Sequence, residues 1–455
     1  MSQLNQGRRT IARPTHEGAP TRATTPSQQL RKSVLACLLW EDTFYEEGDS
    51  IADRISHGVS QVPPQEVHDL AIEARTQFRM RHAPLLLAVE MARHHNGRIV
   101  GDTICGVIQR ADELTEILTL FSRDREGAKK LNRLPKQLQR GVARAFQKFD
   151  AYQLAKYNRP GPICLRDALF LVHAKPKNKD QEATWKQLVD GTLASPDTWE
   201  VGLSSGADKK ETFTRLLQEK KLGYMALLRN LRNMETVGVD RELVRAAILS
   251  GAAHSKALPF RFVSAAKHAP IFEPELDTAM QASLQNLPRL KGRTSICIDC
   301  SDSMSATLSK RSELSRREAA AALAILAGGV CDSFDVFVFG DSCKQIPARA
   351  NLALMDRVRK VNAGGWYDTG DPNCPYVGHG TNIGGVVEDA VATHPDRIIV
   401  VTDLQSRTPV MNPRGYRGYF INTAVYQNGV GYGPWTNIDG FSEATIRYIT
   451  EIERG

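Results

Sequence analysis

The hydrophobic pattern of this chain changes once, near Leu290, and that change most constrains its fold. Before this point, from about residue 28, apolar residues recur at spacings of three and four, the periodicity of amphipathic helices. After it, strand-like runs with apolar centres, at residues 293–301, 333–341 and 396–406, alternate with helical segments. Such an alternation indicates a parallel sheet covered by helices on both faces. The sequence therefore predicts a multidomain protein with an all-α part and a doubly wound α/β part.

The predicted helices are similar in length and are joined by short loops, which favours stacked helix pairs. They cover residues 30–40, 64–76, 81–93, 111–121, 136–157, 165–173, 183–190, 210–219, 222–233 and 240–249. Pro, Thr, Ser and Gln dominate residues 14–29, a composition typical of a flexible arm. We therefore divide the chain into a flexible basic arm (1–27), a helical-repeat domain (28–288) and an α/β domain (289–455).

Composition indicates the cellular compartment in which such a chain would be found. No apolar run reaches about 18 residues, so we expect no membrane span. The N-terminus carries no export signal, and eight scattered cysteines then suggest free thiols in a reducing cytoplasm. Cys297 and Cys300 form a CxxC, but no second pair has zinc spacing and the first lies in an apolar strand. We predict that both are core thiols.

The positive charge of the chain is concentrated in one segment. The net charge is +8, and residues 121–180 alone contain fifteen lysines and arginines against five acidic residues. Within the predicted helix 136–153, Val142, Phe146 and Phe149 form an apolar stripe. Arg140, Arg144 and Lys148 step by four on the opposite side, without acidic partners at helical spacing. This pattern predicts a phosphate-binding face, and a solvated helical surface is the alternative.

Oxygen-bearing side chains follow the predicted strands where a parallel sheet places its binding site. Asp299, Ser301 and Ser303 follow the first strand, Thr381 lies in the glycine-rich loop GHGTNIGG, and Asp403 ends a third strand. Carboxylates and hydroxyls suit Mg²⁺, with Mn²⁺ or Ca²⁺ as alternatives. The sequence therefore predicts a divalent metal site. In the competing interpretation, Asp299 and the serines only cap the following helix.

An enzyme is the main functional alternative at this site. A phosphatase of the haloacid dehalogenase type needs a second Asp where this chain has Ser301. The chain also contains no P-loop, no HExxH and no GxSxG motif. His379 lies beside Thr381 and could carry a proton, although a loop histidine that bonds its own backbone is the simpler interpretation. We predict no catalytic residue.

The metal-site residues resemble the metal-ion-dependent adhesion site of von Willebrand factor A domains. Together with the helical part, the chain resembles the Ro autoantigen, or TROVE-domain, family of RNA-binding proteins. The segments that carry the resemblance are LLWEDTFYEEGD (38–49), MRHAPLLLAVEMAR (80–93), LPKQLQRGVARAFQKFDAYQLAKYNR (134–159), LRDALFLVHAKPK (165–177), ALLRNLRNM (226–234), FRFVSAAK (260–267), KGRTSICIDCSDSM (291–304) and NGVGYGPWTNIDGFSEATI (428–446).

The resemblance implies a ring of HEAT-like helical repeats closed by the A domain, in a monomeric, non-catalytic, cytoplasmic protein. It implies Y-like small RNA on an outer basic surface and single-stranded ends of misfolded or precursor RNA in a central hole. It also implies a possible exoribonuclease partner, and an acidic protein ligand at the metal site. The residues that match RNA contacts are His173, Lys156 and Arg159, and we add Lys175 and Lys177 beside them. Without the resemblance, His173 could equally be a core histidine of the helix LRDALFLVH.

Three functions remain open from the sequence. The first is a non-catalytic RNA-binding ring, and the second is a metal-dependent hydrolase or nuclease that uses the Asp299 site. The third is a docking module in which a partner's acidic residue completes the metal shell, which is compatible with the first.

Overall fold

The computed structural model describes most of the chain: residues 25–35, 48–77, 80–123, 134–195, 197–204, 206–253, 255, 257, 259–285, 289–307, 314–423, 434–439, 445–446, 449–450 and 453. The predicted arm, residues 1–27, therefore lies outside the described residues except for its last three. The same holds for residues 36–40 of the first predicted helix.

The helical part follows the periodicity of the sequence. Its α-helices are α1 (Pro26–Leu35), α2 (Gly48–Gln61), α3 (Pro64–Thr76), α4 (His82–His94), α5 (Arg98–Val107), α6 (Glu113–Arg123), α7 (Lys136–Phe146), α8 (Ala151–Tyr157), α9 (Leu165–Leu171), α10 (Lys179–Asp190), α11 (Trp199–Ser204), α12 (Lys209–Gln218), α13 (Tyr224–Thr236), α14 (Arg241–Gly251), α15 (Pro259–His268) and α16 (Glu273–Leu284). Helices α2, α5, α11, α15 and α16 were not among those predicted from the spacing of apolar residues.

One predicted helix proves to be two. The apolar stripe runs on through residue 149, but α7 ends at Phe146 and α8 begins only after Asp150. The Asp150 carboxylate accepts the backbone N–H of Gln153, and the Gln153 side chain accepts the N–H of Asp150. Such a capping box satisfies amide groups that a continuous helix would bond internally, so it starts a new helix here.

The α/β part is a six-stranded sheet in the order β3-β2-β1-β4-β5-β6. Its strands are β1 (Leu290–Asp299), β2 (Cys331–Phe339), β3 (Cys343–Ile346), β4 (Arg397–Thr402), β5 (Arg417–Asn422) and β6 (Thr436–Asp439). All neighbouring pairs are parallel except β2 and β3, which form an antiparallel edge. Its helices are the 3₁₀ turn η2 (Asp302–Ser305), α17 (Arg316–Val330), α18 (Leu352–Arg359) and α19 (Ile383–Val391). The predicted combination of helical repeats with a doubly wound α/β domain is confirmed.

The described residues form three hydrophobic cores, of which the smallest lies between α19 and the sheet. The two larger cores do not meet at residue 290, where the sequence pattern changes. One core lies within α1 to α10. The other runs without interruption from α12 through α16 into α17 and one face of the sheet. At this junction Lys267 of α15 lies 3.6 Å from the carboxylate of Glu318, and the Asp277 carboxylate accepts the N–H of Leu352 at 3.0 Å. The second half of the helical part is therefore fixed rigidly to the α/β domain.

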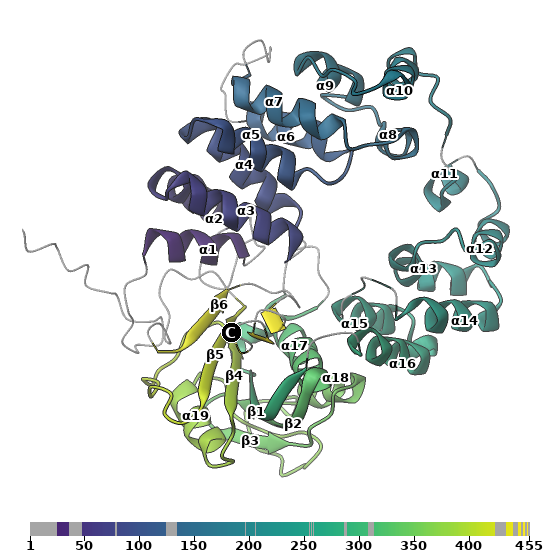
Figure 1. Cartoon of the computed structure of the whole chain (residues 1–455). Coiled ribbons are helices and arrows are strands. Elements are labelled where there is room, and N and C mark those ends of the chain that lie inside the picture. The colour runs from purple at the N-terminus through teal and green to yellow at the C-terminus, as the bar shows by residue number, and fades with distance from the viewer. Residues whose placement is uncertain are drawn as a thin grey trace, which may run out of the picture.

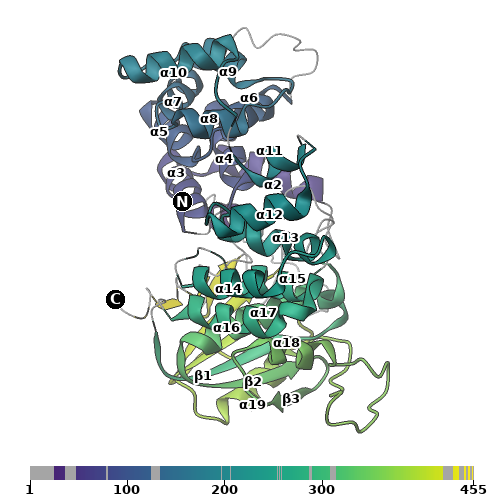
Figure 2. The same cartoon turned by 90° about the vertical axis from the view of Figure 1, so that its right-hand side faces the viewer.

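The helices follow a ring-like course. Figure 1 shows them leaving the α/β domain at α1, curving through α7, α9 and α10, and returning through α12 to α16. The α1 helix contacts β6, while α15 and α16 contact α17, so both ends of the curve meet the same domain. In the view of Figure 2, α7 to α10 lie at the end of the molecule opposite the sheet.

The predicted core thiols are confirmed. Cys297 and Cys300 are fully buried, and burial raises the pKa of Cys300 to about 12. Every described cysteine is a free thiol. Among the described helices, none has both the length and the apolar character needed to span a bilayer.

Candidate nucleic-acid interface and metal site

Two glycines set the geometry of the most basic part of the molecule. A Cβ atom on Gly141 of α7 would lie 2.8 Å from the backbone oxygen of Gly101 of α5 and 2.6 Å from Cβ of Ile104. Only glycine permits so close a helix crossing, because any larger residue would meet backbone atoms. The crossing brings the charged side chains at the start of α5 beside those of α7.

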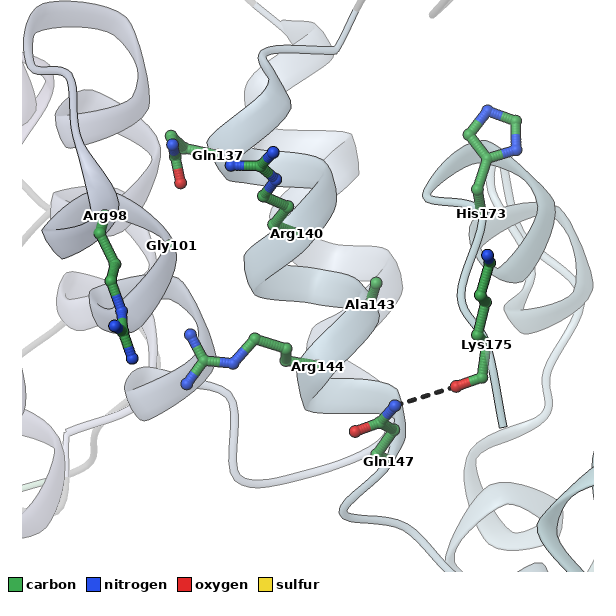
Figure 3. A pocket seen from close by; sticks show the side chains of 9 residues that line it. All are labelled: Arg98, Gly101, Gln137, Arg140, Ala143, Arg144, Gln147, His173 and Lys175. Atoms are coloured by element: carbon green, nitrogen blue, oxygen red, sulfur yellow. Dashed lines mark hydrogen bonds between the residues drawn. The ribbon is translucent and has the colours of Figure 1, made fainter. Parts of the chain in front are cut away.

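A groove of about 500 Å³ lies along this pair of helices. Its walls come from three elements: α5, α7 and the segment that follows α9. The residues that line it are Arg98, Gly101, Gln137, Arg140, Ala143, Arg144, Gln147, His173 and Lys175. Figure 3 shows α7 in the middle, with Arg98 and Gly101 on one side and His173 and Lys175 on the other.

Positive charge dominates this groove. Arg144 forms an ion pair with Asp102 of α5, and the Nε atom of Arg98 lies 3.5 Å from the same carboxylate. The hydrogen bond from Arg144 lowers the pKa of Asp102, so this carboxylate stays ionised. Arg140 and Lys175 are exposed and form no ion pair with any residue that the structure describes. One acid therefore faces four cations.

His173 is not a core residue, so that interpretation of the sequence is wrong. The helix α9 ends at Leu171, and His173 follows it, exposed, with a left-handed φ of 51°. Its N–H still donates to the oxygen of Phe170 at 3.2 Å. Glycine or asparagine usually occupies such a position, because other side chains are strained there. This backbone conformation turns the imidazole toward solvent at the wall of the groove (Figure 3).

The segment after α9 is held against the end of α7 by hydrogen bonds centred on Gln147. The amide nitrogen of Gln147 donates to the backbone oxygen of Lys175 at 2.9 Å. In return, the backbone oxygen of Gln147 accepts Nζ of Lys177 and the amide of Gln181, both at 3.2 Å. Lys175 therefore points into the groove from a fixed backbone, whereas the Lys177 side chain is used in holding it.

The other predicted RNA contacts lie elsewhere. Lys148 donates to the backbone oxygens of Cys105 and Ile108, at the end of α5, and so supports the helix crossing. Lys156 on α8 lies with its Nζ 5.9 Å from the ring centre of Tyr157, and Arg159 is exposed after that helix. Neither Lys156 nor Arg159 lines the groove.

Arg98 and Gln137 are among the groove residues that the sequence did not reveal, because their place in the groove depends on the helix crossing. Arg98 begins α5, and Gln137 begins α7 beside it. Arg98 sits in a weakly charged helix, so neither local charge density nor helical spacing marks it. In the sequence, only Gly101 and Gly141 could have indicated that these two helices cross closely, because small residues allow helices to approach each other.

The residues of the predicted metal site come together at the carboxyl ends of β1 and β4. Asp299 ends β1, Asp403 directly follows β4, and both are fully buried, as is Thr381. The oxygens of Ser301 and Ser303 lie 3.3 Å apart. Asp299 accepts the N–H of Ser301 at 2.9 Å and the hydroxyl of Thr402 at 2.5 Å.

The loop that carries Thr381 is fixed by Asp341, which follows β2. The Asp341 carboxylate accepts the N–H groups of His379 at 2.8 Å and Gly380 at 3.0 Å, and the Arg407 guanidinium at 2.5 Å. A Cβ atom on Gly380 would lie 2.6 Å from this carboxylate, which explains the glycine. Asp341 therefore positions the loop, a role that the sequence did not reveal.

The chemistry of this cluster fits a hard cation. Burial raises the pKa of Asp299 to about 7, aided by the charge of Asp403, and burial likewise raises the pKa of Asp403. The Oδ2 atom of Asp403 is buried and accepts no hydrogen bond from the part of the chain that the structure describes. Two buried carboxylates with one unused oxygen and three hydroxyls offer only oxygen ligands, which suit Mg²⁺ or Ca²⁺.

The competing interpretation, in which Asp299 and the serines after it cap the following helix, is wrong for α17. That helix is capped by Ser315, whose hydroxyl accepts the N–H of Glu318 at 3.1 Å.

His379 was interpreted as a loop histidine that bonds its own backbone, and its side chain has other partners. Its Nδ1 atom bonds the carboxylate of Asp302 at 2.6 Å, and its ring stacks against Trp366 with ring centres 4.0 Å apart.

Comparison with known proteins decides the family. The family model of the TROVE domain matches residues 22–192 and 190–325, so its second match extends from the helical part through η2 into α17. The chain belongs to the TROVE-domain family. Two curated relatives match a short stretch of the chain. Telomerase protein component 1 of Mus musculus is 36% identical over 96 residues, and that of Rattus norvegicus is 37% identical over 78 residues. These matches cover 20% and 16% of this chain but only 4% and 3% of the relatives, so the chain spans a small part of their length.

A solved structure matches nearly the whole TROVE chain. The crystal structure of the Deinococcus radiodurans RO (RSR) protein covers 95% of this chain and 100% of its own, with a TM-score of 0.58 and 18% identity. At this identity the similarity establishes the fold. Membership of the TROVE-domain family supports RNA binding.

Proposed function

We propose that the groove between α5, α7 and the segment after α9 binds the phosphate backbone of a structured small RNA of the Y type. The observation that carries the proposal is the group of cations around this groove, of which Arg140 and Lys175 form no ion pair with a described residue. Lysine and arginine neutralise phosphates, and the release of counterions then drives binding. His173 adds a planar ring that can stack on a nucleotide or bond it.

The ring-like course of the helices supports a second element of this function (Figure 1). Single-stranded ends of misfolded or maturing RNAs would engage the centre of the ring, while the groove holds the structured RNA. Such a protein would serve RNA quality control, processing or decay, with an exoribonuclease as partner. The cations of the groove supply affinity in this scheme, and the chemistry on RNA is left to the partner.

The experiment is a comparison of two charge reversals. Arg98→Glu/Arg140→Glu changes the groove, and Lys209→Glu/Lys210→Glu makes the same change in charge on α12, where both lysines are exposed. Affinity for a hairpin RNA is measured by fluorescence anisotropy. The groove variant should lose at least tenfold in affinity, and the α12 variant should bind like the unmodified protein. Equal losses in both variants would show that only net charge matters, and would refute the groove.

We further propose that a divalent cation, Mg²⁺, is held by Asp299, Ser301, Ser303, Thr381 and Asp403. The unpartnered, buried oxygen of Asp403 carries this second proposal. A bound cation would offset the mutual repulsion of the two buried carboxylates. It would also leave a coordination position that the carboxylate of an acidic protein partner can fill.

Calorimetry with MgCl₂ and MnCl₂ tests the metal proposal. Asp403→Asn should abolish binding, because it removes a buried carboxylate of the site. Asp302→Asn is the matched control, since Asp302 lies in the same loop but pairs with His379. Loss of metal binding in both variants, or in neither, would contradict the assignment of ligands.

A further inference from the structure

The helices next to the groove expose two aromatic side chains. Among the described residues of α1 to α10, the large hydrophobic side chains that are more than a third exposed are Tyr152 (51%) and Phe170 (55%). A single exposed apolar residue needs no explanation, since much of any protein surface is apolar. Here, however, the two are both aromatic, and they lie on neighbouring short helices in the most basic segment of the chain.

Each aromatic residue shares a helical face with a cation. Tyr152 and Lys156 are four residues apart on α8, and Arg166 and Phe170 are four apart on α9. Residues at this spacing lie on the same face of a helix. Phe170 also lies one turn before His173, whose N–H bonds its backbone oxygen. The aromatic face of α9 therefore adjoins the wall of the groove.

Both α8 and α9 contact α10. Figures 1 and 2 show the three helices together at the end of the molecule far from the sheet. We call the exposed aromatic residues of these two helices and the cations at helical spacing from them the α8–α9 face: Tyr152, Lys156, Arg166 and Phe170.

The positive charge of residues 134–178, which include α7, α8 and α9, is not neutralised by the acidic residues among them. Residues 134–178 contain nine lysines and arginines but only two acids, Asp150 and Asp167. Both carboxylates cap helices: Asp150 accepts the N–H of Gln153 at 2.7 Å, and Asp167 accepts the N–H of Cys164 at 3.0 Å. Arg159 and Arg166 are exposed and form no ion pair with a described residue.

We propose that the α8–α9 face binds unpaired nucleotides of RNA by stacking, next to the groove that holds backbone phosphates. The proposal rests on the RNA-binding function proposed above. Exposed aromatic rings interleaved with cations are the usual platform for single-stranded nucleic acid, because every base has a face that can stack. The bases of an A-form duplex are already stacked and inaccessible, so this face selects single-stranded segments. An acidic partner protein would be matched by the charge alone and would not need the two exposed rings.

The test uses two RNAs that differ only in an unpaired segment: a blunt hairpin, and the same hairpin with an internal bulge of unpaired nucleotides, which adds no free single-stranded end. The bulge should increase affinity for the unmodified protein. Tyr152→Ser/Phe170→Ser should lose that increase, by about tenfold or more, since stacking contributes about 1–3 kcal/mol per base. Binding of the blunt hairpin should stay unchanged. The conservative variant Tyr152→Phe/Phe170→Tyr should keep the increase, because both rings remain.

The control variant is Val201→Ser/Leu249→Ser, which removes two exposed apolar side chains from α11 and α14. It should behave like the unmodified protein with both RNAs. A bulge that still increases affinity fully in Tyr152→Ser/Phe170→Ser would overturn the proposal, as would an equal loss with both RNAs. Failure of the groove itself is detected separately, because Arg98→Glu/Arg140→Glu would then bind the blunt hairpin normally.

Discussion

Four cations line the groove, and their number sets how strongly salt should weaken RNA binding. Each neutralised phosphate lowers the logarithm of the association constant by about 0.7–0.9 for every tenfold increase in salt. Arg98, Arg140, Arg144 and Lys175 would then give a slope of about −3 to −4. Affinity should fall on the order of 100-fold between 50 and 200 mM salt. Because Arg144 already pairs with Asp102, its own share should be the smallest.

Removing two of these cations should change the slope as well as the affinity. Arg98→Ala/Arg140→Ala eliminates two proposed phosphate contacts, so the slope should become shallower by about 2. Anisotropy titrations of a hairpin RNA at four or five salt concentrations measure this directly. Lys209→Ala/Lys210→Ala on α12 is the control with the same loss of charge, and its slope should equal that of the unmodified protein. A double variant in the groove that keeps the full slope would refute the reasoning, even if its affinity were lower.

Three further predictions follow from other contacts. Burial raises the pKa of Asp299 to about 7 from 3.8, so metal-free protein should lose stability as pH rises through this range. A bound cation needs ionised carboxylates, so Mg²⁺ should raise the Tm more at pH 8 than at pH 6; an equal shift would argue against this site. Glu453→Ala should destabilise the fold by about 3 kcal/mol, because Glu453 bonds the buried Arg397 at 2.7 and 2.8 Å. Arg417→Ala, whose side chain is 56% exposed, should cost less than about 1 kcal/mol in urea unfolding, and similar losses would contradict this ranking. Gly141→Ala should destabilise by about 1–3 kcal/mol through overpacking at the α5–α7 crossing, and should weaken RNA binding. Gly161→Ala, with no atom closer than 3.9 Å, should do neither, so a neutral Gly141→Ala would refute the role given to the crossing.

The sequence predicted the fold wherever one segment carries the information by itself. The apolar stripe of α7 is buried as expected at Val142 and Phe146, and Arg140 and Arg144 face outward. The strands β1, β2 and β4 overlap the strand-like runs 293–301, 333–341 and 396–406 that the sequence predicted. Strands β3, β5 and β6 were not, because they are short, with four to six residues, and carry polar residues such as Lys344 and Asn437.

The details of the site depend on contacts between distant segments, which periodicity does not reveal. Arg144 and Lys148 have no acidic partner within their own segment, yet the structure pairs the first with Asp102 and the second with carbonyl groups of α5. Arg98 enters the groove only because Gly101 and Gly141 allow two helices to touch. The metal-site residues, by contrast, were predicted as one group because parallel strands bring their carboxyl ends to one edge.

The most direct test of the central claim is to map where RNA touches the protein. Hairpin RNA containing photoreactive uridines is crosslinked to the purified protein, and the attached peptides are identified by mass spectrometry. The account predicts crosslinks in peptides from α5, α7 and residues 173–177, which line the groove or flank it. Crosslinks confined to the α/β domain after residue 290, with none in these helices, would contradict it.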